Sequence, residues 1–314
     1  MTDAAREARL SRPPGTAPTI ATAGDVDPAP LRLAGWQLRG VLSNLPYADR
    51  ADATTYAEAD ELLADERLDA VAVDGEDREL ARLLPALRGS GLLLLLPTAA
   101  PQDPGLVRAA RAVPDAAEAC VGLLRRWEPW ARTVAAAMPL AGGPPGQLTV
   151  RGWPRGRQAA AELVDLVAAW CGEVVAVVAA PAALPADELP GGAAVAWALL
   201  TESGATALVS HEGGPEQVRL SFETARLEAA RVGVRWEGGA ELPLFRAPGE
   251  APRQPGVDPG LVATAAALIR AVGGGDVPTG QWPWAADLGD LLVVARVLEA
   301  LRTSARTETL VPVA

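Results

Sequence analysis

Two domains are predicted from this sequence: a doubly wound α/β domain with a parallel sheet, then an α+β domain with an open, largely antiparallel sheet. The chain has 314 residues, which is enough for two domains of ordinary size. In its first part, short apolar runs alternate with amphipathic stretches, as in parallel strands joined by helices. Between residues 193 and 239, Gly and Pro turns separate successive strand candidates, as in an antiparallel sheet.

The α/β domain is expected over residues 19–125. Residues 1–18 before it are polar and rich in Pro, which predicts a disordered N-terminus. Strands are expected where apolar runs lie between turn residues, and helices where apolar residues recur at helical spacing. The predicted strands are 36–43, 69–75 and 91–97, and the predicted helices are 56–68, 76–90 and 103–113.

The second domain is expected over residues 126–314. Its central stretch, 159–180, reads as an apolar helix, a Gly stop at Gly172 and then a strand. The other predicted helices are 127–140, 258–272 and 286–303, and the other predicted strands are 146–153, 193–203, 205–213, 216–224, 225–239 and 308–313.

Charge and composition exclude several kinds of partner and chemistry. The net charge is −11 and the pI is near 4.8, which argues against nucleic acid and against an anionic membrane surface as partners. All 28 basic residues are Arg, so no lysine is available for a Schiff base, for acid catalysis or for a phosphate-binding loop.

Cysteine content and targeting signals point to the cytoplasm. The two cysteines, Cys120 and Cys171, are too few for a disulfide framework or a zinc site, and no metal is expected. The N-terminus has no apolar segment typical of a signal peptide, and the longest aliphatic run, 92–96, is too short to span a bilayer. A cytoplasmic location is therefore the expectation.

Four segments, in order, resemble the Gfo/Idh/MocA oxidoreductases. "ELLADERLDAVAV" (61–73) is similar to the segment before that family's fourth strand, and "ALRGSGLLLLLPTA" (86–99) to the run ending in Glu-Lys-Pro. "ELVDLVAAWCGEVVAVVA" (162–179) resembles the family's His-x-x-Asp helix, and residues 287–313 its closing helix and strand. The resemblance covers roughly residues 19–313 and implies a Rossmann-like N-terminal domain followed by the family's α+β domain.

The resemblance also implies a dinucleotide site, whose Gly-rich turn is missing from this chain. That turn lets backbone N–H groups approach the cofactor's pyrophosphate. Here Gly24 is the one glycine of the turn. Asp25 and Asp27 would repel a pyrophosphate, and Pro28 and Pro30 remove N–H donors. We therefore expect no cofactor, with NAD or NADP as the alternative.

Four residues are the candidates for any cofactor contact that remains. Ser43 or Asn44 stands where the family places an acidic residue for the ribose, and Asp74 follows a parallel strand at the end where ligands bind. Asp74 is equally well explained by turn chemistry. The candidate set is Gly24, Ser43, Asp74 and Pro97, the last being the proline of the Glu-Lys-Pro run.

The catalytic residues that the resemblance implies are only partly present. The lysine of Glu-Lys-Pro falls on Leu96, the histidine of His-x-x-Asp falls on Glu162, and the aspartate is kept as Asp165. Glu162 and Asp165 are the candidate catalytic residues, because two nearby carboxylates push their pKa values apart and can serve as acid and base. The alternative is that Glu162 is solvated and Asp165 bonds only to an arginine or to backbone. The single histidine, His211, either points into a pocket or is an ordinary surface or core residue.

Two functions remain open at this point. The first is a pseudo-oxidoreductase that acts as a partner subunit or as a small-molecule binder. The second is an active enzyme of sugar or secondary metabolism that uses Glu162 or Asp165, either an NAD(P)-dependent oxidoreductase or a cofactor-free lyase or cyclase. The resemblance implies that the open sheet forms an interface, so a homodimer or a pairing with a related intact subunit is expected.

Overall fold

The computed structural model describes two compact units. One unit comprises residues 1–124 and 251–292, and the other comprises residues 125–250 and 293–314. The described residues are 16–42, 53–63, 65, 67–74, 77–87, 90–99, 102–113, 119–154, 156–181, 194–211, 215–223, 225–230, 233–237, 257–272 and 285–314. The predicted disordered segment 1–18 therefore lies outside them, apart from its last three residues. Among the described helices, none combines the length and apolarity needed to cross a bilayer.

The first unit contains a six-stranded parallel sheet, which confirms the predicted α/β class. Its strand order is β3-β2-β1-β4-β5-β6, so the chain winds outward in both directions from β1 and β4. Every described residue of β1, β4 and β5 is buried, because helices cover both faces of a doubly wound sheet. The strands are β1 (Thr19–Ala23), β2 (Gln37–Leu42), β3 (Thr54–Tyr56), β4 (Ala70–Val73), β5 (Leu93–Leu96) and β6 (Cys120–Val121).

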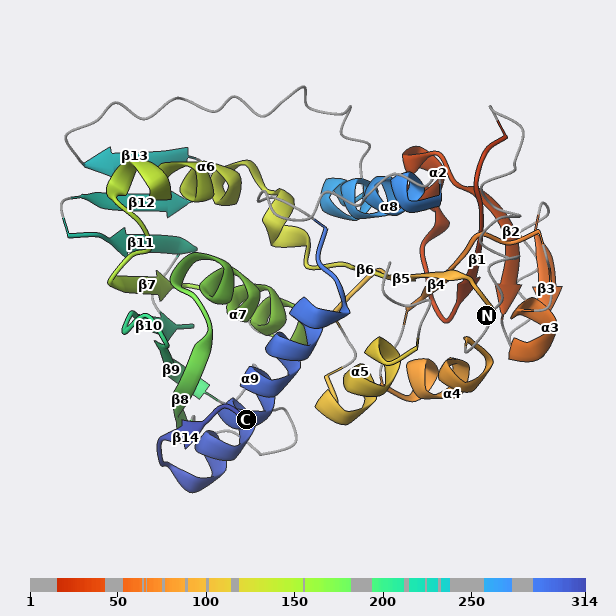
Figure 1. Cartoon of the computed structure of the whole chain (residues 1–314). Coiled ribbons are helices and arrows are strands. Elements are labelled where there is room, and N and C mark those ends of the chain that lie inside the picture. Colours follow the sequence, from red (N-terminus) through yellow and green to blue (C-terminus); the bar gives the residue numbers. More distant parts are fainter. Residues whose placement is uncertain are drawn as a thin grey trace. The chain divides into compact units, whose positions relative to one another are not determined.

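Among the described residues, five helices belong to this unit, and Figure 1 shows their arrangement around the sheet. Figure 1 shows α2 (Pro28–Ala34) and α8 (Pro259–Val272) together on one face, and α4 (Asp77–Leu87) and α5 (Pro104–Arg111) on the other. The fifth helix, α3 (Ala59–Leu63), packs against α4. It is shorter than the predicted helix 56–68: Tyr56 belongs to strand β3, and the described residues 65, 67 and 68 are not helical.

Helix α8 belongs to the first unit, although the chain places it more than 130 residues after that unit's sheet. It packs against α2 and the β5–β6 side of the sheet, and Trp36 donates from Nε1 to the carbonyl oxygen of Ala265 at 2.9 Å. Since Ala265 and Leu268 are fully buried, α8 is apolar on the side that faces this core. The structural division therefore differs from the predicted contiguous domains 19–125 and 126–314.

The second unit contains an eight-stranded mixed sheet, which confirms the predicted open, largely antiparallel arrangement. Its order is β13-β12-β11-β7-β10-β9-β8-β14, and among the described strands only β7 and β10 are paired in parallel. The strands are β7 (Gln147–Arg151), β8 (Val174–Pro181), β9 (Ala194–Thr201), β10 (Thr206–Ser210), β11 (Gln217–Ser221), β12 (Arg226–Ala230), β13 (Gly233–Glu237) and β14 (Val311–Pro312).

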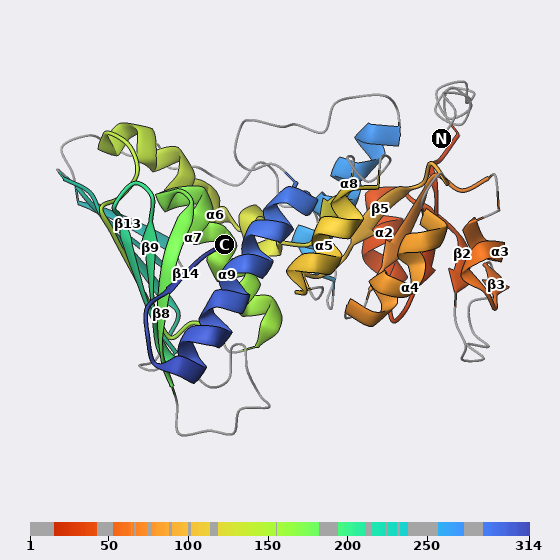
Figure 2. The same cartoon turned by 60° about the horizontal axis from the view of Figure 1, so that its bottom comes forward.

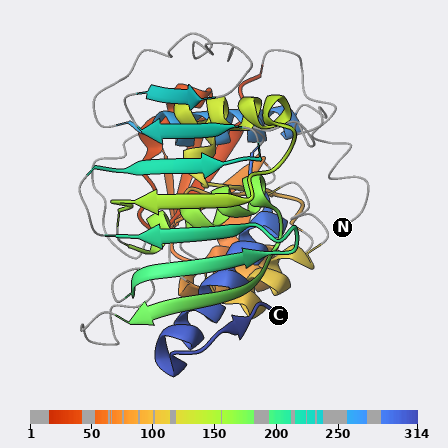
Figure 3. The ribbon, with the colours of Figure 1, turned by 90° about the vertical axis from the view of Figure 1, so that its left-hand side faces the viewer.

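The helices of the second unit lie on one face of this sheet. Figures 1 and 2 place α6 (Pro129–Ala137), α7 (Arg157–Cys171) and α9 (Leu288–Thr307) on the same side. Short 3₁₀ turns, η2 (Leu124–Trp127) and η3 (Met138–Ala141), flank α6. Figure 3 shows the opposite face of the sheet, on which no described helix packs. Strands β10, β11 and β12 accordingly alternate buried and more exposed residues.

Candidate functional site

The carboxyl edge of the parallel sheet brings three of the predicted cofactor residues together. Gly24 follows β1 with φ +82°, and a side chain there would overlap the carbonyl oxygen of Asp74, which follows β4. The Asp74 amide donates to the carbonyl oxygen of Ala23 at 3.0 Å, so the two strand ends are held in contact. Gly24 is thus required by the close approach of two backbones.

The Asp74 carboxylate lies at this same edge. Its Oδ1 accepts a hydrogen bond of 3.2 Å from the hydroxyl of Thr98, which follows β5. Pro97 is buried, and its carbonyl oxygen packs so closely on Gly122 that a side chain at Gly122 would overlap it. Ser43, the fourth predicted cofactor residue, lies outside the described residues.

The turn between β1 and α2 is capped by the chain itself. The side chain of Asp27 accepts from the amide of Ala29 at 2.9 Å and so occupies the N-terminus of α2. Pro28 and Pro30 supply no N–H group, and Asp25 is exposed beside the turn. A dinucleotide's pyrophosphate needs free N–H donors and no adjacent carboxylate, so the residues of this turn do not fit that group.

The predicted catalytic carboxylates lie in the second unit, on α7. Asp165 is 3% exposed and accepts two hydrogen bonds from Arg126, one from Nε at 2.7 Å and one from Nη2 at 2.5 Å. Arg126 is itself 2% exposed. A two-pronged bond of this kind between buried opposite charges fixes both side chains and uses both carboxylate oxygens.

Glu162, one turn earlier on α7, lies in a second group of charges. It is 7% exposed, which contradicts the alternative in which Glu162 is solvated. Its carboxylate accepts from Gln158 Nε2 at 2.8 Å and lies 3.4 Å from Arg125 Nε. Arg125 also forms ion pairs of 3.0 Å with Glu128 and with Glu216.

Arg125 is held in its charged form by these neighbours. Burial by itself lowers the pKa of its guanidinium, but the negative charges of Glu128, Glu216 and Glu162 raise the pKa above its ordinary value overall. The guanidinium carbon also lies 4.9 Å from the ring centroid of Trp153, within cation–π range. Arg125 therefore acts as a permanent cation that binds three carboxylates.

A tryptophan cluster packs beside this group. Trp130 meets Trp153 and Trp170 edge-on, with ring centroids 6.5 Å and 5.9 Å apart. Trp153 also donates from Nε1 to the carbonyl oxygen of Ala159 at 2.7 Å. These contacts, and its burial, favour a structural role for Trp130.

His211 follows β10 and is only partly exposed. Its Nδ1 lies 3.0 Å from the carbonyl oxygen of Trp153, so Nδ1 carries the proton in this contact. Its ring meets Trp197 edge-on at a centroid distance of 5.0 Å. These contacts are those of a packed histidine with a fixed tautomer.

Sequence reasoning found the two α7 carboxylates and allowed an arginine as the partner of Asp165, but it did not identify which arginines bind them. No local pattern connects Arg126 to Asp165, which lies 39 residues away, or Arg125 to Glu216, which lies 91 residues away. The one available signal was the Arg-Arg pair itself, which follows an apolar run at the start of the second domain. Among the residues that the structure describes, no group of three or more His, Cys, Asp or Glu side chains is arranged to hold a metal ion.

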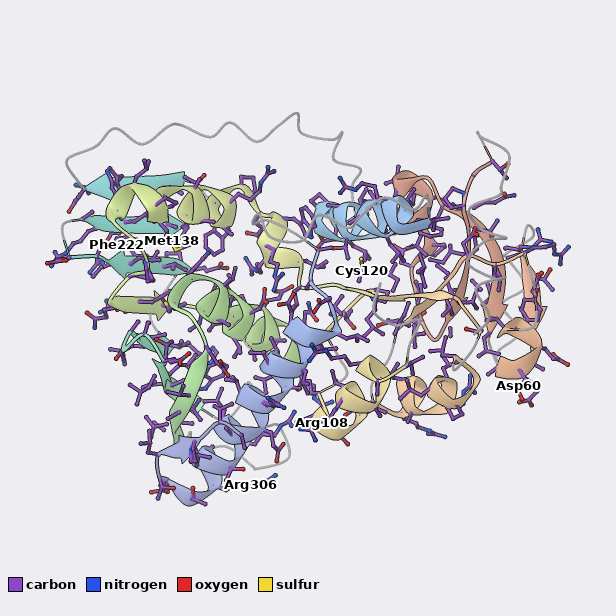
Figure 4. The ribbon with its side chains drawn as sticks, viewed as in Figure 1. Asp60, Arg108, Cys120, Met138, Phe222 and Arg306 are labelled. Atoms are coloured by element: carbon purple, nitrogen blue, oxygen red, sulfur yellow. The ribbon has the colours of Figure 1, made fainter. Side chains whose placement is uncertain are left out.

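The two cysteines are buried thiols rather than nucleophiles. Cys120, labelled in Figure 4, lies on β6, and Cys171 ends α7; both are at most 1% exposed. Burial raises the pKa of each thiol from 9.0 to about 12. Neither side chain is a thiolate at neutral pH.

Comparison with known proteins gives similarity at the level of structure only. No protein-family model matches the chain, and no curated protein does. The WlbA dehydrogenase from Bordetella pertussis, solved with NADH and UDP-GlcNAcA, superposes with a TM-score of 0.74 at 15% identity, over 95% of this chain and 99% of that one. The chain has the Gfo/Idh/MocA fold. This confirms the fold and two-sheet architecture that the sequence predicts.

Two further structures share this fold. Levoglucosan dehydrogenase in complex with NADH gives a TM-score of 0.72 at 12% identity, over 95% of this chain and all of that one. The aldose-aldose oxidoreductase from Caulobacter crescentus, complexed with glycerol, gives 0.69 at 18% identity over the same shares. At these identities the likeness is one of fold, and activity has to be argued from residues.

The close contact between Gly24 and Asp74 predicts that a single methyl group added at residue 24 strongly destabilises the fold. Gly24→Ala is expected to lower the free energy of unfolding by about 2–5 kcal/mol, from backbone strain and overlap together. Gly35→Ala is the matched control: its φ is +103°, but a side chain there meets only Ile269 at an ordinary 3.6 Å. The control is expected to lose about 1–2 kcal/mol. Urea unfolding followed by tryptophan fluorescence measures both, and equal losses would contradict the close approach.

The buried pair Arg126–Asp165 predicts that Asp165→Asn destabilises the fold by about 3–5 kcal/mol, because it removes the carboxylate that balances the buried charge of Arg126. The control is Glu299→Gln, which removes an exposed partner of Arg302 and should change stability by no more than about 0.5 kcal/mol. Arg126→Met combined with Asp165→Leu should recover most of the loss. If Asp165→Asn were as stable as the parent protein, the pair would have no structural role.

The raised pKa values of the two thiols predict that thiol reagents label the cysteines of the folded protein slowly. At pH 8, a thiol reagent such as DTNB should leave Cys120 and Cys171 unmodified in the folded protein and should react with both in urea. Since each folded-state pKa lies above the unfolded value of 9.0, the unfolded chain loses protons first, and the free energy of unfolding falls as the pH rises from about 9. Rapid labelling of either folded thiol would show that it is accessible.

Proposed function

We propose that this chain is a non-redox protein built on an oxidoreductase fold, which acts as a partner subunit or as a binder of a small molecule. The observation that carries the proposal is the self-capped turn between β1 and α2. The carboxylate of Asp27 takes the place that a pyrophosphate would take at the start of α2. Pro28 and Pro30 leave few N–H groups for any other anion there.

Residues of both units support the part of the proposal that concerns catalysis, namely that the chain does not carry out ordinary hydride transfer. In the first unit, β5 ends in Leu96, where the resemblance implies a lysine, and the chain has no lysine that could replace it. In the second unit, the carboxylate of Asp165 is bound by Arg126 through both oxygens. Losing a positioned acid–base group typically slows a reaction about 10²- to 10⁴-fold. Hydride transfer of the ordinary kind is therefore not part of the proposed function.

The proposed partner surface is the open face of the eight-stranded sheet, shown in Figure 3. Either a second copy of the chain or a related intact oxidoreductase would cover it. Exposed Val175 and Val178 on β8 and exposed Leu208 on β10 support an interface, because they place apolar side chains on the same half of the sheet, on either side of β9.

If a small molecule binds, we propose a polyhydroxylated one of the carbohydrate class. The support is indirect: the solved structures with this fold include complexes with levoglucosan, L-sorbose and UDP-GlcNAcA. Several Asp side chains lie near the carboxyl edge of the first sheet, and carboxylates accept hydrogen bonds from sugar hydroxyls. Asp74 is the candidate acceptor.

The alternative is an active enzyme that uses Glu162 or Asp165, with NAD(P) or as a cofactor-free lyase or cyclase. For this function the Glu162 carboxylate would have to give up its contacts with Gln158 and Arg125 and instead exchange a proton with a substrate. A substrate would also have to reach this side chain, which is 7% exposed.

Direct calorimetry separates the non-redox proposal from an NAD(P)-dependent oxidoreductase. We expect no heat when NAD⁺, NADH, NADP⁺ or NADPH is added to the full chain at millimolar concentration, and no thermal shift. Levoglucosan dehydrogenase, which has been solved with NADH, serves as the positive control under the same conditions.

A micromolar dissociation constant for any of the four dinucleotides would overturn the non-redox proposal. Glu162→Gln would then be compared with Gln158→Ala for activity. A loss confined to Glu162→Gln would assign the acid–base role to that carboxylate.

A further inference from the structure

Charged side chains line a depression on the second unit, over strands β11, β12 and β13. The depression has a volume of about 360 Å³, which is within the range of sites that bind small molecules. It lies on the face of the sheet that Figure 3 shows. Five side chains line it: Arg219, Arg226, Glu228, Arg235 and Glu237.

The alternation of side chains along the strands places these charges on one surface. Successive side chains of a strand point to opposite faces of the sheet. In β12, Leu227 is fully buried between Arg226 and Glu228, so these two neighbours point outward. The register then sets Glu228 opposite Arg219 on one side and opposite Arg235 on the other. Charges from three separate strands therefore converge on one place.

The strands under the depression form a fixed scaffold. β12 is paired along its whole length, with β11 on one side and β13 on the other. Helix α6 packs against β12 and β13. A site on paired strands holds its side chains closer to one geometry than a site on a loop does.

Four of the five charges are paired with one another inside the depression. Arg219 donates from Nε to Glu228 Oε1 at 2.8 Å, and its Nη2 bonds to the same oxygen. Arg235 Nη2 lies 2.9 Å from Glu237 Oε1. In each glutamate the arginine contacts Oε1, which leaves Oε2 able to accept a hydrogen bond from another donor.

Arg226 is the fifth charge, and it is exposed. None of the ion pairs among the described residues includes Arg226. Its neighbour in the register, Glu237, pairs with Arg235 instead. Three guanidiniums and two carboxylates give the depression a net charge of +1, on a chain whose net charge is −11. The N–H groups of Arg226 match the two oxygens of a carboxylate in geometry and in charge.

We propose that this depression binds a small polyhydroxylated carboxylate, that is, a sugar acid. The carboxylate of the ligand would accept a two-pronged bond from Arg226, and its hydroxyls would donate to the Oε2 atoms of Glu228 and Glu237. The inference goes beyond the proposed function and does not depend on it. The depression lies on β11–β13, whereas the exposed apolar side chains that support the partner surface lie on β8 and β10.

The pattern of charges favours this class of ligand over three others. A dianion such as inorganic phosphate would face two carboxylates, with one unpaired guanidinium to offset them. An amino-acid zwitterion would need a carboxylate for its ammonium group, and both carboxylates of the depression have guanidinium partners. A neutral sugar would leave Arg226 without a partner. A monoanion with several hydroxyls uses the guanidinium of Arg226 and the second oxygen of each glutamate.

The test is calorimetric titration of the full chain with D-glucuronate at low ionic strength, where exposed charges are least screened. We expect a dissociation constant of about 0.1–1 mM. Acetate carries the carboxylate without the hydroxyls, and glucose carries the hydroxyls without the carboxylate. Each should bind at least about tenfold more weakly than glucuronate, because each loses one set of hydrogen bonds to charged groups.

A pair of arginine variants tests the position of the site. Arg226→Gln removes the proposed partner of the carboxylate and should weaken glucuronate binding by about 10- to 100-fold. Arg151→Gln is the matched control, because Arg151 is an exposed arginine of β7 that lies on the same face but outside the depression. Its affinity for glucuronate should equal that of the parent chain. Both side chains are exposed, so both variants should keep the parent melting temperature.

Each contrary result overturns a defined part of the inference. No heat with glucuronate at about 10 mM, or equal affinities of Arg226→Gln and the parent chain, would rule out this site. Acetate or phosphate that binds as tightly as glucuronate would show a general anion site, and tighter binding of serine would show a zwitterion site. Dinucleotide calorimetry tests the non-redox proposal separately. A chain that binds NADH, and that loses glucuronate through Arg226→Gln, would keep this inference and overturn that function.

Discussion

The buried bond between Arg126 and Asp165 is the interaction on which the interior of the second unit depends. Arg126 lies in the 3₁₀ turn where the chain enters this unit, and Asp165 lies in the middle of α7. A guanidinium that is 2% exposed needs an opposite charge nearby, because the water it has lost stabilised it strongly. The bond therefore fixes the position of α7 relative to the entering chain, and α7 in turn covers the inner face of the mixed sheet.

The same interaction changes how α7 is understood. Two acids three residues apart on an apolar helix are unusual for a core, and such a spacing invites an acid–base interpretation. In the structure each acid is matched by one of two consecutive arginines, Asp165 by Arg126 and Glu162 by Arg125. The polar content of the helix is thus accounted for by ion pairing within the unit, whatever further role Glu162 has.

Much of the fold follows from local patterns in the sequence. Apolar runs such as residues 91–97 and the Gly stop after α7 locate strands and helices because burial and backbone conformation act over a few residues. Local chemistry also identified the residues of the β1–α2 turn that disfavour a pyrophosphate, because Asp27 adds a negative charge there and Pro28 lacks an N–H group. Strands β3 and β6, with three and two residues, were too short to leave a pattern.

Contacts between residues that are far apart in the sequence could not be predicted from local patterns. Nothing in residues 259–272 indicates that α8 packs beside α2 instead of continuing the second domain, because an apolar helix fits either core. The pairing of Arg125 with Glu216 likewise joins residues that only the fold brings together. Candidate site residues come from positions that a family motif marks, whereas the arginines that bind them could not be identified, because ion pairs between distant residues have no fixed sequence spacing.

The edges of the mixed sheet have a consequence for how this protein avoids uncontrolled assembly. An edge strand with free backbone groups is a template onto which other chains can add, as in fibrils. Among the described strands, β13 is the last on one side and carries exposed Arg235 and Glu237, while β14 on the other side has two residues, one of them Pro312. Charge on one edge, and brevity with a missing N–H on the other, make both poor templates. Growth by strand addition is thereby discouraged at both ends of the sheet.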